Sequence, residues 1–308
     1  MPVQLSSSRR TGYVMAFISA AGTGVATVLG KWNLEHVSAL TMNCLIFTVA
    51  TLLMTVFWLP VKGVRTTFTQ TRQGWLWLSL FAVTSALAVW AFWAGVQQMD
   101  PSLAAFLNRA EVPLAILMGV VLLRERFTRG ETVGTIVALA GIIIMRATLR
   151  VEYSLGFYLV LLGAFFFALT EYLSKIALRH VQATSLAYIR NMLMAVIYWV
   201  VFWIGDYDLG GLRHVWLGIV ALGFMGPVFN RITYLWALER LELSKVAVIG
   251  QMQPVFTVIV AFLALGLLPT VRETSGGVCL LLGCILMVLY RRRHPVTEVA
   301  EAASGSTT

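Results

Sequence analysis

The chain has 308 residues, of which 59% are hydrophobic and only 12% charged; soluble domains carry about 25% charged residues. Its formal net charge is +9, but most lysines and arginines stand in short segments between apolar runs. That placement is typical of a membrane protein and argues against a nucleic-acid-binding domain. The three cysteines lie inside apolar runs without the spacing of a zinc or haem motif, so neither a metal nor another cofactor is expected.

Ten apolar runs are long enough, at roughly 20 residues each, to cross a bilayer as helices. The first five cover about 12–30, 39–59, 74–97, 101–123 and 131–147. The second five cover about 154–174, 184–204, 213–238, 243–267 and 273–290. The polar, small-residue-rich segment 294–308 is expected to be a disordered cytoplasmic tail.

The second five runs repeat the first five. Matches at a near-constant offset join Lys31 with Lys175, His36 with His180, Pro113 with Pro254, Gly134 with Gly276, and Gly141 with Gly283. Because each copy crosses the membrane an odd number of times, the second copy must insert upside down. We therefore predict an all-α membrane protein of ten transmembrane helices in two inverted five-helix repeats, 1–150 and 151–293, a construction plan of secondary transporters.

The charges also predict an orientation. Placing the N-terminus in the cytoplasm puts most of the 23 lysines and arginines in inside segments. Since cytoplasmic loops are enriched in positive charge, both termini are expected to be cytoplasmic, in a bacterial inner membrane. Lys31 then lies outside and its repeat partner Lys175 inside, as inversion requires.

A motif around the end of the fourth run resembles the EamA domain of the drug/metabolite transporter superfamily. It consists of Pro113, Glu125 and Thr128, followed by Gly134 and Gly141. The second copy keeps Pro254, Thr270, Gly276 and Gly283. It departs from the pattern with Leu267 at the glutamate position, and Arg124 in the first copy stands where glycine is usual. The resemblance covers nearly the whole chain and implies a carrier, expected to be an exporter, of amino acids, other metabolites or drugs.

Charged residues inside spans are costly and usually face a cavity or a partner. Five are deep enough to matter, namely Arg109, Glu111, Glu171, Arg190 and Arg231. Glu171 and Arg190 flank one hairpin, so they form either a structural ion pair or part of a proton-coupling path. Arg109 and Glu111 are two residues apart, which on a regular helix points them about 200° apart and away from a common partner. Arg231 lies near enough to the interface for its side chain to reach the headgroups instead.

Three mid-span prolines, Pro113, Pro227 and Pro254, predict helix breaks, because proline removes a backbone hydrogen bond. Broken helices near the midplane are where transporters bind substrates. Polar residues beside these breaks and two deep tryptophans are the predicted substrate-binding residues, although packing is an equally simple explanation for each. They are Asn108, Arg109, Glu111, Trp90, Trp93, Gln251, Gln253, Asn230, Arg231 and Tyr234.

Charges of both signs favour a zwitterionic cargo, with amino acids as the first choice, moved by alternating access. An excess of arginine keeps organic anions or phosphorylated metabolites as the alternative. A lipid flippase or a membrane-embedded enzyme is the alternative from another class. No Walker, HExxH or GxSxG motif is present, so enzyme activity is not expected. The expected partners are a small-molecule substrate, the lipid bilayer and protons, carried by Glu111 first and Glu171 second; monomer and dimer both stay open.

Overall fold

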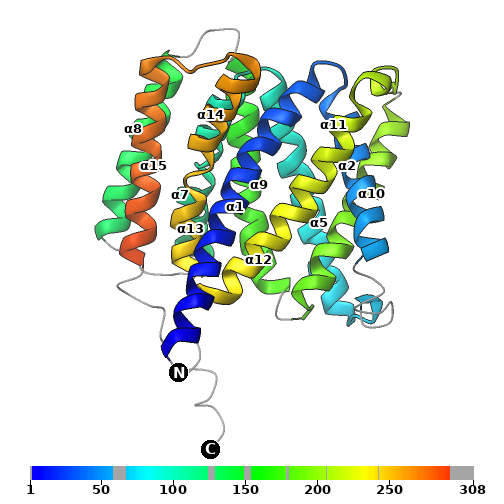
Figure 1. Ribbon diagram of the computed structural model, residues 1–308, viewed down its shortest axis with the longest axis horizontal. Helices are drawn as coiled ribbons and strands as arrows, with labels where there is room; N and C mark the ends of the chain where they lie inside the picture. The colour runs from blue at the N-terminus through cyan, green and yellow to red at the C-terminus, as the bar shows by residue number, and fades with distance from the viewer. Residues whose placement is uncertain are drawn as a thin grey trace, which may run out of the picture.

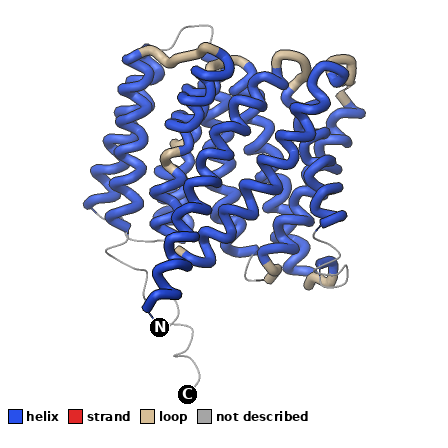
Figure 2. Tube along the Cα trace, viewed as in Figure 1, coloured by secondary structure: helices blue, strands red, loops and turns tan. Residues whose placement is uncertain are grey.

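The computed structural model describes residues 2–57, 67–123, 129–148, 154–177, 180–205, 207–241 and 243–291, and this part of the chain is helical without strands (Figures 1 and 2). The motif residues from Arg124 to Thr128 and the predicted tail 294–308 lie outside the described residues. The helices stand roughly side by side, and α1 begins on the same side of the bundle as the end of α15 (Figure 1).

The described helices fall on the predicted apolar runs, although α1 begins well before the first run and the fourth and ninth runs are each divided in two. The first half contains α1 (Pro2–Leu34), α2 (Ala39–Phe57), α5 (Arg72–Gln97), α6 (Pro101–Asn108), α7 (Glu111–Leu123) and α8 (Arg129–Thr148). The second half contains α9 (Ser154–Ala177), α10 (Ala183–Ile204), α11 (Leu212–Phe224), the π-helix η2 (Met225–Asn230), α12 (Arg231–Arg240), α13 (Leu243–Gly250), α14 (Gln253–Leu265) and α15 (Val271–Arg291).

Eight helical stretches among the described residues are long and apolar enough to cross a membrane, and Thr132–Ala147 forms a shorter apolar helix. The predicted fourth span, 101–123, is not among these eight; it is divided into α6 and α7, of 8 and 13 residues. The sequence reads as one apolar run there, whereas the backbone leaves the helical path at Arg109 and Ala110. The described residues therefore establish a multi-span helical membrane protein and give a smaller span count than the predicted ten.

Helices α8 and α15 pack against each other through glycines that occupy equivalent places in the two copies. A Cβ added to Gly134 would lie 2.8 Å from the Gly283 carbonyl oxygen, and one on Gly141 would lie 2.6 Å from that of Gly276. Because the lower-numbered glycine of α8 faces the higher-numbered one of α15, the two helices run antiparallel. Glycine permits this backbone approach, since any side chain would fill the space between the helices.

The N-terminus of α15 shows a reciprocal cap that the sequence analysis did not identify. The backbone N–H of Thr270 donates to Glu273 Oε2 at 2.8 Å, and the Glu273 N–H donates to Thr270 Oγ1 at 3.3 Å. This is the capping-box arrangement, recognisable from the Thr-x-x-Glu spacing. Glu273 of the repeated motif is therefore used to begin a helix.

On the side remote from the start of α1, the last turn of α1 is tied to α5. Lys31 Nζ donates to the carbonyl oxygens of Val96 and Gln97, both at 3.0 Å, and Gln97 Nε2 donates to Leu34 O at 3.3 Å. These bonds satisfy carbonyls at the C-terminus of α5 with a cation, which also suits the helix dipole. They join α1 and α5 at this end of the bundle.

The two halves of the chain pack closely against each other. Helix α1 of the first half packs against α12 and α14 of the second, and α7 packs against α9. The interrupted helices α6–α7, α11–α12 and α13–α14 all contact this central group or one another. The irregular backbone is thus enclosed by protein, the condition under which a membrane protein tolerates it.

The glycine contact between α8 and α15 predicts a local stability effect. Replacing Gly141 by Leu forces a side chain against the backbone of α15, and overpacking of this kind costs about 1–3 kcal/mol. We expect a lower melting temperature for the purified protein in detergent. The same change at the adjacent, exposed Ala140 is the matched control and should leave the melting temperature nearly unchanged; equal losses at both positions would contradict the packing argument.

Candidate functional site

A cavity of about 970 Å³ lies between the two halves of the chain. Its size is at the upper end of the range for sites that enclose small molecules. Most of the predicted site residues line it. These are Trp93, Asn108, Arg109, Glu111, Glu171, Arg190, Pro227, Asn230, Arg231, Tyr234, Gln251 and Gln253.

The cavity lies beside the helix breaks. Helix α6 ends at Asn108 and α7 begins at Glu111, two residues before Pro113. Helix α13 ends at Gly250 and α14 begins at Gln253, with Pro254 in its first turn. Both prolines therefore lie in the first turn of a new helix. Backbone N–H groups there have no acceptor within the helix, so a residue without an N–H is tolerated. The breaks bring polar side chains and backbone to the wall of the cavity.

The third predicted break is a different structure. Pro227 lies within η2, a six-residue π-helix that joins α11 and α12 without a turn. A π segment inserts an extra residue into the helix and is often found at functional sites. Here it places Asn230 and Arg231 at the cavity wall.

Arg109 and Glu111 face each other, which corrects the prediction that they point in opposite directions. Arg109 Nη2 lies 3.3 Å from Glu111 Oε1, with side-chain exposures of 10% and 23%. The prediction assumed a regular helix with 100° per residue. The chain instead turns between α6 and α7, so two residues that a helix would separate are brought to one side of the backbone.

The same guanidinium connects the two breaks. Arg109 Nη2 donates to Gln253 Oε1 at 2.7 Å, and Nη1 donates to the Gly250 carbonyl at 3.5 Å. Gly250 stands four residues before Pro254, so its carbonyl is the one that the proline leaves without a helical donor. An arginine of the first half thus binds the carbonyl freed by the proline of the second half.

The reverse contact also exists. Arg109 stands four residues before Pro113, and its own carbonyl accepts from the Cys284 thiol of α15 at 3.4 Å. It accepts from the Val112 N–H at 3.0 Å as well. Each proline-freed carbonyl is therefore bound by a side chain from the other half of the chain. In the sequence, Cys284 is a small residue in an apolar run, and nothing in its position indicates this contact.

Glu171, Arg190 and Arg231 behave differently, because none of them forms an ion pair within 4 Å among the described residues. The Glu171–Arg190 ion pair considered from the sequence is therefore not present as a direct contact. Arg190 Nε donates instead to Ser85 Oγ at 2.9 Å, and its guanidinium lies 5.6 Å from the centre of the Phe81 ring. The charges that remain available in the cavity thus include both signs, all from the second half of the chain.

Two asparagines add unsatisfied polar atoms to the cavity wall. Asn230 is 7% exposed, and neither its side-chain oxygen nor its nitrogen has a hydrogen-bond partner among the described residues. The Asn108 side-chain oxygen also has no hydrogen-bond partner among the described residues. Buried amides are normally hydrogen-bonded, so these atoms depart from the usual pattern; they are covered by protein in this conformation, and the Asn230 side-chain oxygen faces Gly22 of α1.

Trp90 is the predicted site residue that the structure places elsewhere. It is 38% exposed and shares a face of α5 with the exposed Val83 and Leu87, at helical spacing. This face points out of the bundle, whereas Trp93 is 8% exposed and lines the cavity. Depth along the span gave the same prediction for both tryptophans, and only the packing of α5 distinguishes them.

One end of the cavity is aromatic. Phe92 contacts Trp93 and Phe167 edge-to-face, with ring centres 5.2 and 6.3 Å apart. Phe47 also lines the cavity, and its ring centre lies 5.7 Å from that of Tyr198. These phenylalanines are not among the predicted site residues, because an apolar side chain in an apolar span carries no signal of its own.

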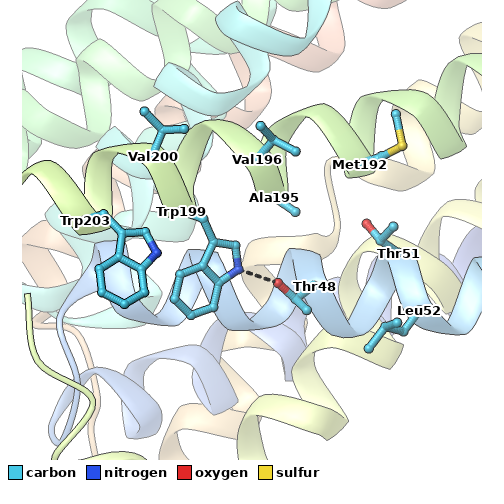
Figure 3. A pocket seen from close by; sticks show the side chains of 9 residues that line it. All are labelled: Thr48, Thr51, Leu52, Met192, Ala195, Val196, Trp199, Val200 and Trp203. Atoms are coloured by element: carbon cyan, nitrogen blue, oxygen red, sulfur yellow. Dashed lines mark hydrogen bonds between the residues drawn. The ribbon is translucent and has the colours of Figure 1, made fainter.

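A second hollow, of about 410 Å³, lies between α2 and α10 on the outside of the bundle (Figure 3). Its lining is apolar except for two threonines. The Trp199 Nε1–H donates to Thr48 Oγ1 at 2.9 Å, and Thr51 Oγ1 donates to the Phe47 carbonyl at 2.7 Å (the first bond is drawn in Figure 3). With no charge and no free polar group, this hollow suits lipid tails rather than a polar substrate.

The described residues contain no group of three or more His, Cys, Asp or Glu side chains placed to hold a metal ion. A helical membrane fold with a central, charge-lined cavity at broken helices defines the class of transporters. The family profile of the EamA-like transporter family matches residues 10–147 and again 154–289. The chain belongs to this family.

Two relatives are named as transporters, and one solved structure shares the fold. The "Uncharacterized transporter sll1164" of Synechocystis sp. is 23% identical over 234 residues, covering 70% of this chain and 66% of that protein. The "Uncharacterized transporter in sor 3'region" of Acidianus ambivalens is 31% identical over 179 residues, 56% of this chain and 67% of that protein. A structure described as "Crystal structure of protein" has a TM-score of 0.61 at 18% identity, covers 94% of this chain and 98% of its own, and shows a shared fold.

The contact between Arg109 and Gln253 predicts energetic coupling between the halves. Arg109→Gln and Gln253→Leu should each lower the melting temperature, because each leaves a buried polar group without its partner. The double variant should lose less than the sum of the two, with a coupling of about 0.5–3 kcal/mol.

The exposed Gln98 provides the matched control for this cycle. Gln98→Leu should be additive with Arg109→Gln. Additivity in both cycles would show that the guanidinium does not link the two breaks.

Proposed function

We propose that this protein is a secondary or facilitative carrier of small zwitterionic metabolites, with amino acids as the first candidates, working by alternating access as an exporter. The observation that supports it is the set of cavity charges without ion pairs: Arg190 and Arg231 suit a carboxylate, and Glu171 suits an ammonium group. Arg109 and Glu111 neutralise each other and contribute no net charge to the site.

Inverted repeats of five spans each, ten in all, provide the moving parts of this mechanism. The family profile matches the two halves separately, and repeat-equivalent α8 and α15 pack antiparallel through repeat-equivalent glycines. A self-complementary contact of this kind is what a two-fold axis in the membrane plane generates. Rocking of one repeat against the other about the central cavity then exposes the site to each side in turn.

The described conformation fits an inward-open state. The cavity wall reaches Val246 in the first turn of α13 and Val288 in the last turn of α15, both on the side where α1 begins. Toward the other side of the bundle, Trp93 lines the cavity near the end of α5. One turn further along α5, the hydrogen bonds of Lys31 hold α1 against α5. With most lysines and arginines on the side of the termini, that side is the cytoplasm of the expected bacterial inner membrane.

Organic anions and phosphorylated metabolites are the second candidate cargo. The observation in their favour is the net positive charge of the cavity residues without ion pairs, because these are two arginines and one glutamate. Arginine binds carboxylate and phosphate alike through its planar set of donors. For an anion, Glu171 would repel the substrate and its neutralisation would strengthen binding.

Reconstituted vesicles distinguish these cargoes. We expect saturable uptake of labelled amino acids in counterflow, reduced about tenfold or more by Arg231→Gln and by Glu171→Gln, because each removes a charged hydrogen bond to the substrate. Arg213→Gln, which changes an exposed cation outside the cavity, is the control and should transport like wild type. Flux of organic anions that survives Glu171→Gln would establish the anion carrier, and absence of any saturable flux from folded protein would refute both.

Proton coupling is the second part of the proposal, with Glu111 as the first candidate carrier. Protonation of Glu111 would remove its attraction for Arg109, which holds the two helix breaks together. An imposed pH gradient should therefore stimulate amino-acid flux in wild type, and Glu111→Gln should abolish the stimulation. Wild-type flux that is indifferent to the gradient would support uniport.

A further inference from the structure

The charged and aromatic parts of the cavity form one continuous surface along two helices. On α5, Ser85, which anchors Arg190, is followed at helical spacing by Val89 and Phe92. On α9, Glu171 lies one turn from Phe167, whose ring contacts Phe92. Moving along either helix from the charges therefore leads to the same aromatic end.

Arg190 is held in place before any substrate arrives. Its Nε bonds to Ser85, Nη1 lies 3.4 Å from the Asn191 side-chain oxygen, and the Phe81 ring packs against the guanidinium. The Nη2 group has no partner among the described residues. A guanidinium fixed on one side and free on another is preorganised to bind a carboxylate.

Arg231 provides the second cation. It lines the same cavity, and its side chain forms no hydrogen bond or ion pair within the described part of the chain. Its neighbour Asn230 carries the buried amide without partners. Arg190, Arg231 and Glu171 all line this one cavity, so a small zwitterion bound there has charges of both signs around it.

The direction of the rest of the substrate follows from this arrangement. If the carboxylate binds the arginines and the ammonium group binds Glu171, the side chain of the amino acid points toward Phe167, Phe92 and Trp93. These rings form an apolar surface in which a charged side chain would lose its hydration without gaining a partner. A large apolar side chain gains from burial there.

Resting on the proposed function, we infer that the cavity selects amino acids with large apolar side chains: Arg190 and Arg231 bind the carboxylate, Glu171 binds the ammonium group, and Phe92, Phe167 and Trp93 bind the side chain. Ser85 is a positioning residue that holds Arg190. Selection against small and charged amino acids arises from the aromatic end, and selection for the zwitterion arises from the charged end.

Ligand binding to the purified full-length protein tests this assignment, by thermal shift and by calorimetry. The probes are L-phenylalanine, L-leucine, L-alanine, L-aspartate and L-lysine, with 3-phenylpropanoate lacking the ammonium group and phenethylamine lacking the carboxylate. We expect phenylalanine and leucine to bind about tenfold or more tightly than alanine, and aspartate and lysine more weakly still. Both truncated probes should bind more weakly than phenylalanine.

Variants separate the two ends of the cavity. Arg190→Gln should weaken phenylalanine and 3-phenylpropanoate about tenfold or more but leave phenethylamine unchanged, and Glu171→Gln should do the reverse. Phe92→Ala should remove the preference for phenylalanine over alanine while alanine still binds. Ser85→Ala, which keeps every charge, should weaken phenylalanine less than Arg190→Gln does. Arg213→Gln is the control, and unliganded melting temperatures identify variants that fail to fold.

The possible failures are distinct. If no amino acid binds and none is transported, the proposed function itself is overturned. If amino acids bind but alanine equals phenylalanine, or Phe92→Ala keeps the preference, the aromatic assignment is wrong while the carrier proposal stands. If Arg190→Gln weakens phenethylamine as much as 3-phenylpropanoate, the carboxylate assignment is wrong.

Discussion

One guanidinium, that of Arg109, joins the two places where the transmembrane helices are broken. A proline inside a span frees a carbonyl, and in a membrane that carbonyl must find a donor within the protein. Arg109 binds the carbonyl freed by Pro254, and Cys284 binds the one freed by Pro113. Each break thus receives a side-chain donor from the other half of the chain, and the Arg109 carbonyl also accepts from the Val112 N–H of its own half. The two halves are therefore coupled at the wall of the cavity, where a transporter must sense its substrate.

This coupling divides the five cavity charges into two sets. Arg109 and Glu111 are occupied by each other and by Gln253, so their role is to hold the breaks and, in our proposal, to respond to a proton. Glu171, Arg190 and Arg231 have no ion pairs among the described residues and are available to a ligand. The two sets come from different halves of the chain.

Packing density varies along the bundle in a way that suits movement around a fixed centre. Helices α8 and α15 approach so closely that their glycine positions exclude any side chain, which makes this contact rigid. The centre contains a cavity of about 970 Å³, the two interrupted helices α6–α7 and α13–α14, and the π-helix η2. Interrupted helices have fewer backbone bonds to maintain and bend at lower cost. Rocking about a closely packed glycine contact is consistent with such a distribution.

The sequence by itself determined the membrane class, the apolar runs, the family and the breaks beside Pro113 and Pro254, because hydrophobic length and proline act locally; at Pro227 the chain continues through a π-helix instead of breaking. It could not determine which side chains meet. Arg109 and Glu111 were predicted to point apart, since helical geometry was assumed where the chain turns. Trp90 and Trp93 looked alike in depth, and only the packing of α5 places one in the cavity and the other outside. The anchoring of Arg190 by Ser85, and the aromatic end of the cavity, depend on contacts between helices distant in sequence, which only the tertiary structure decides.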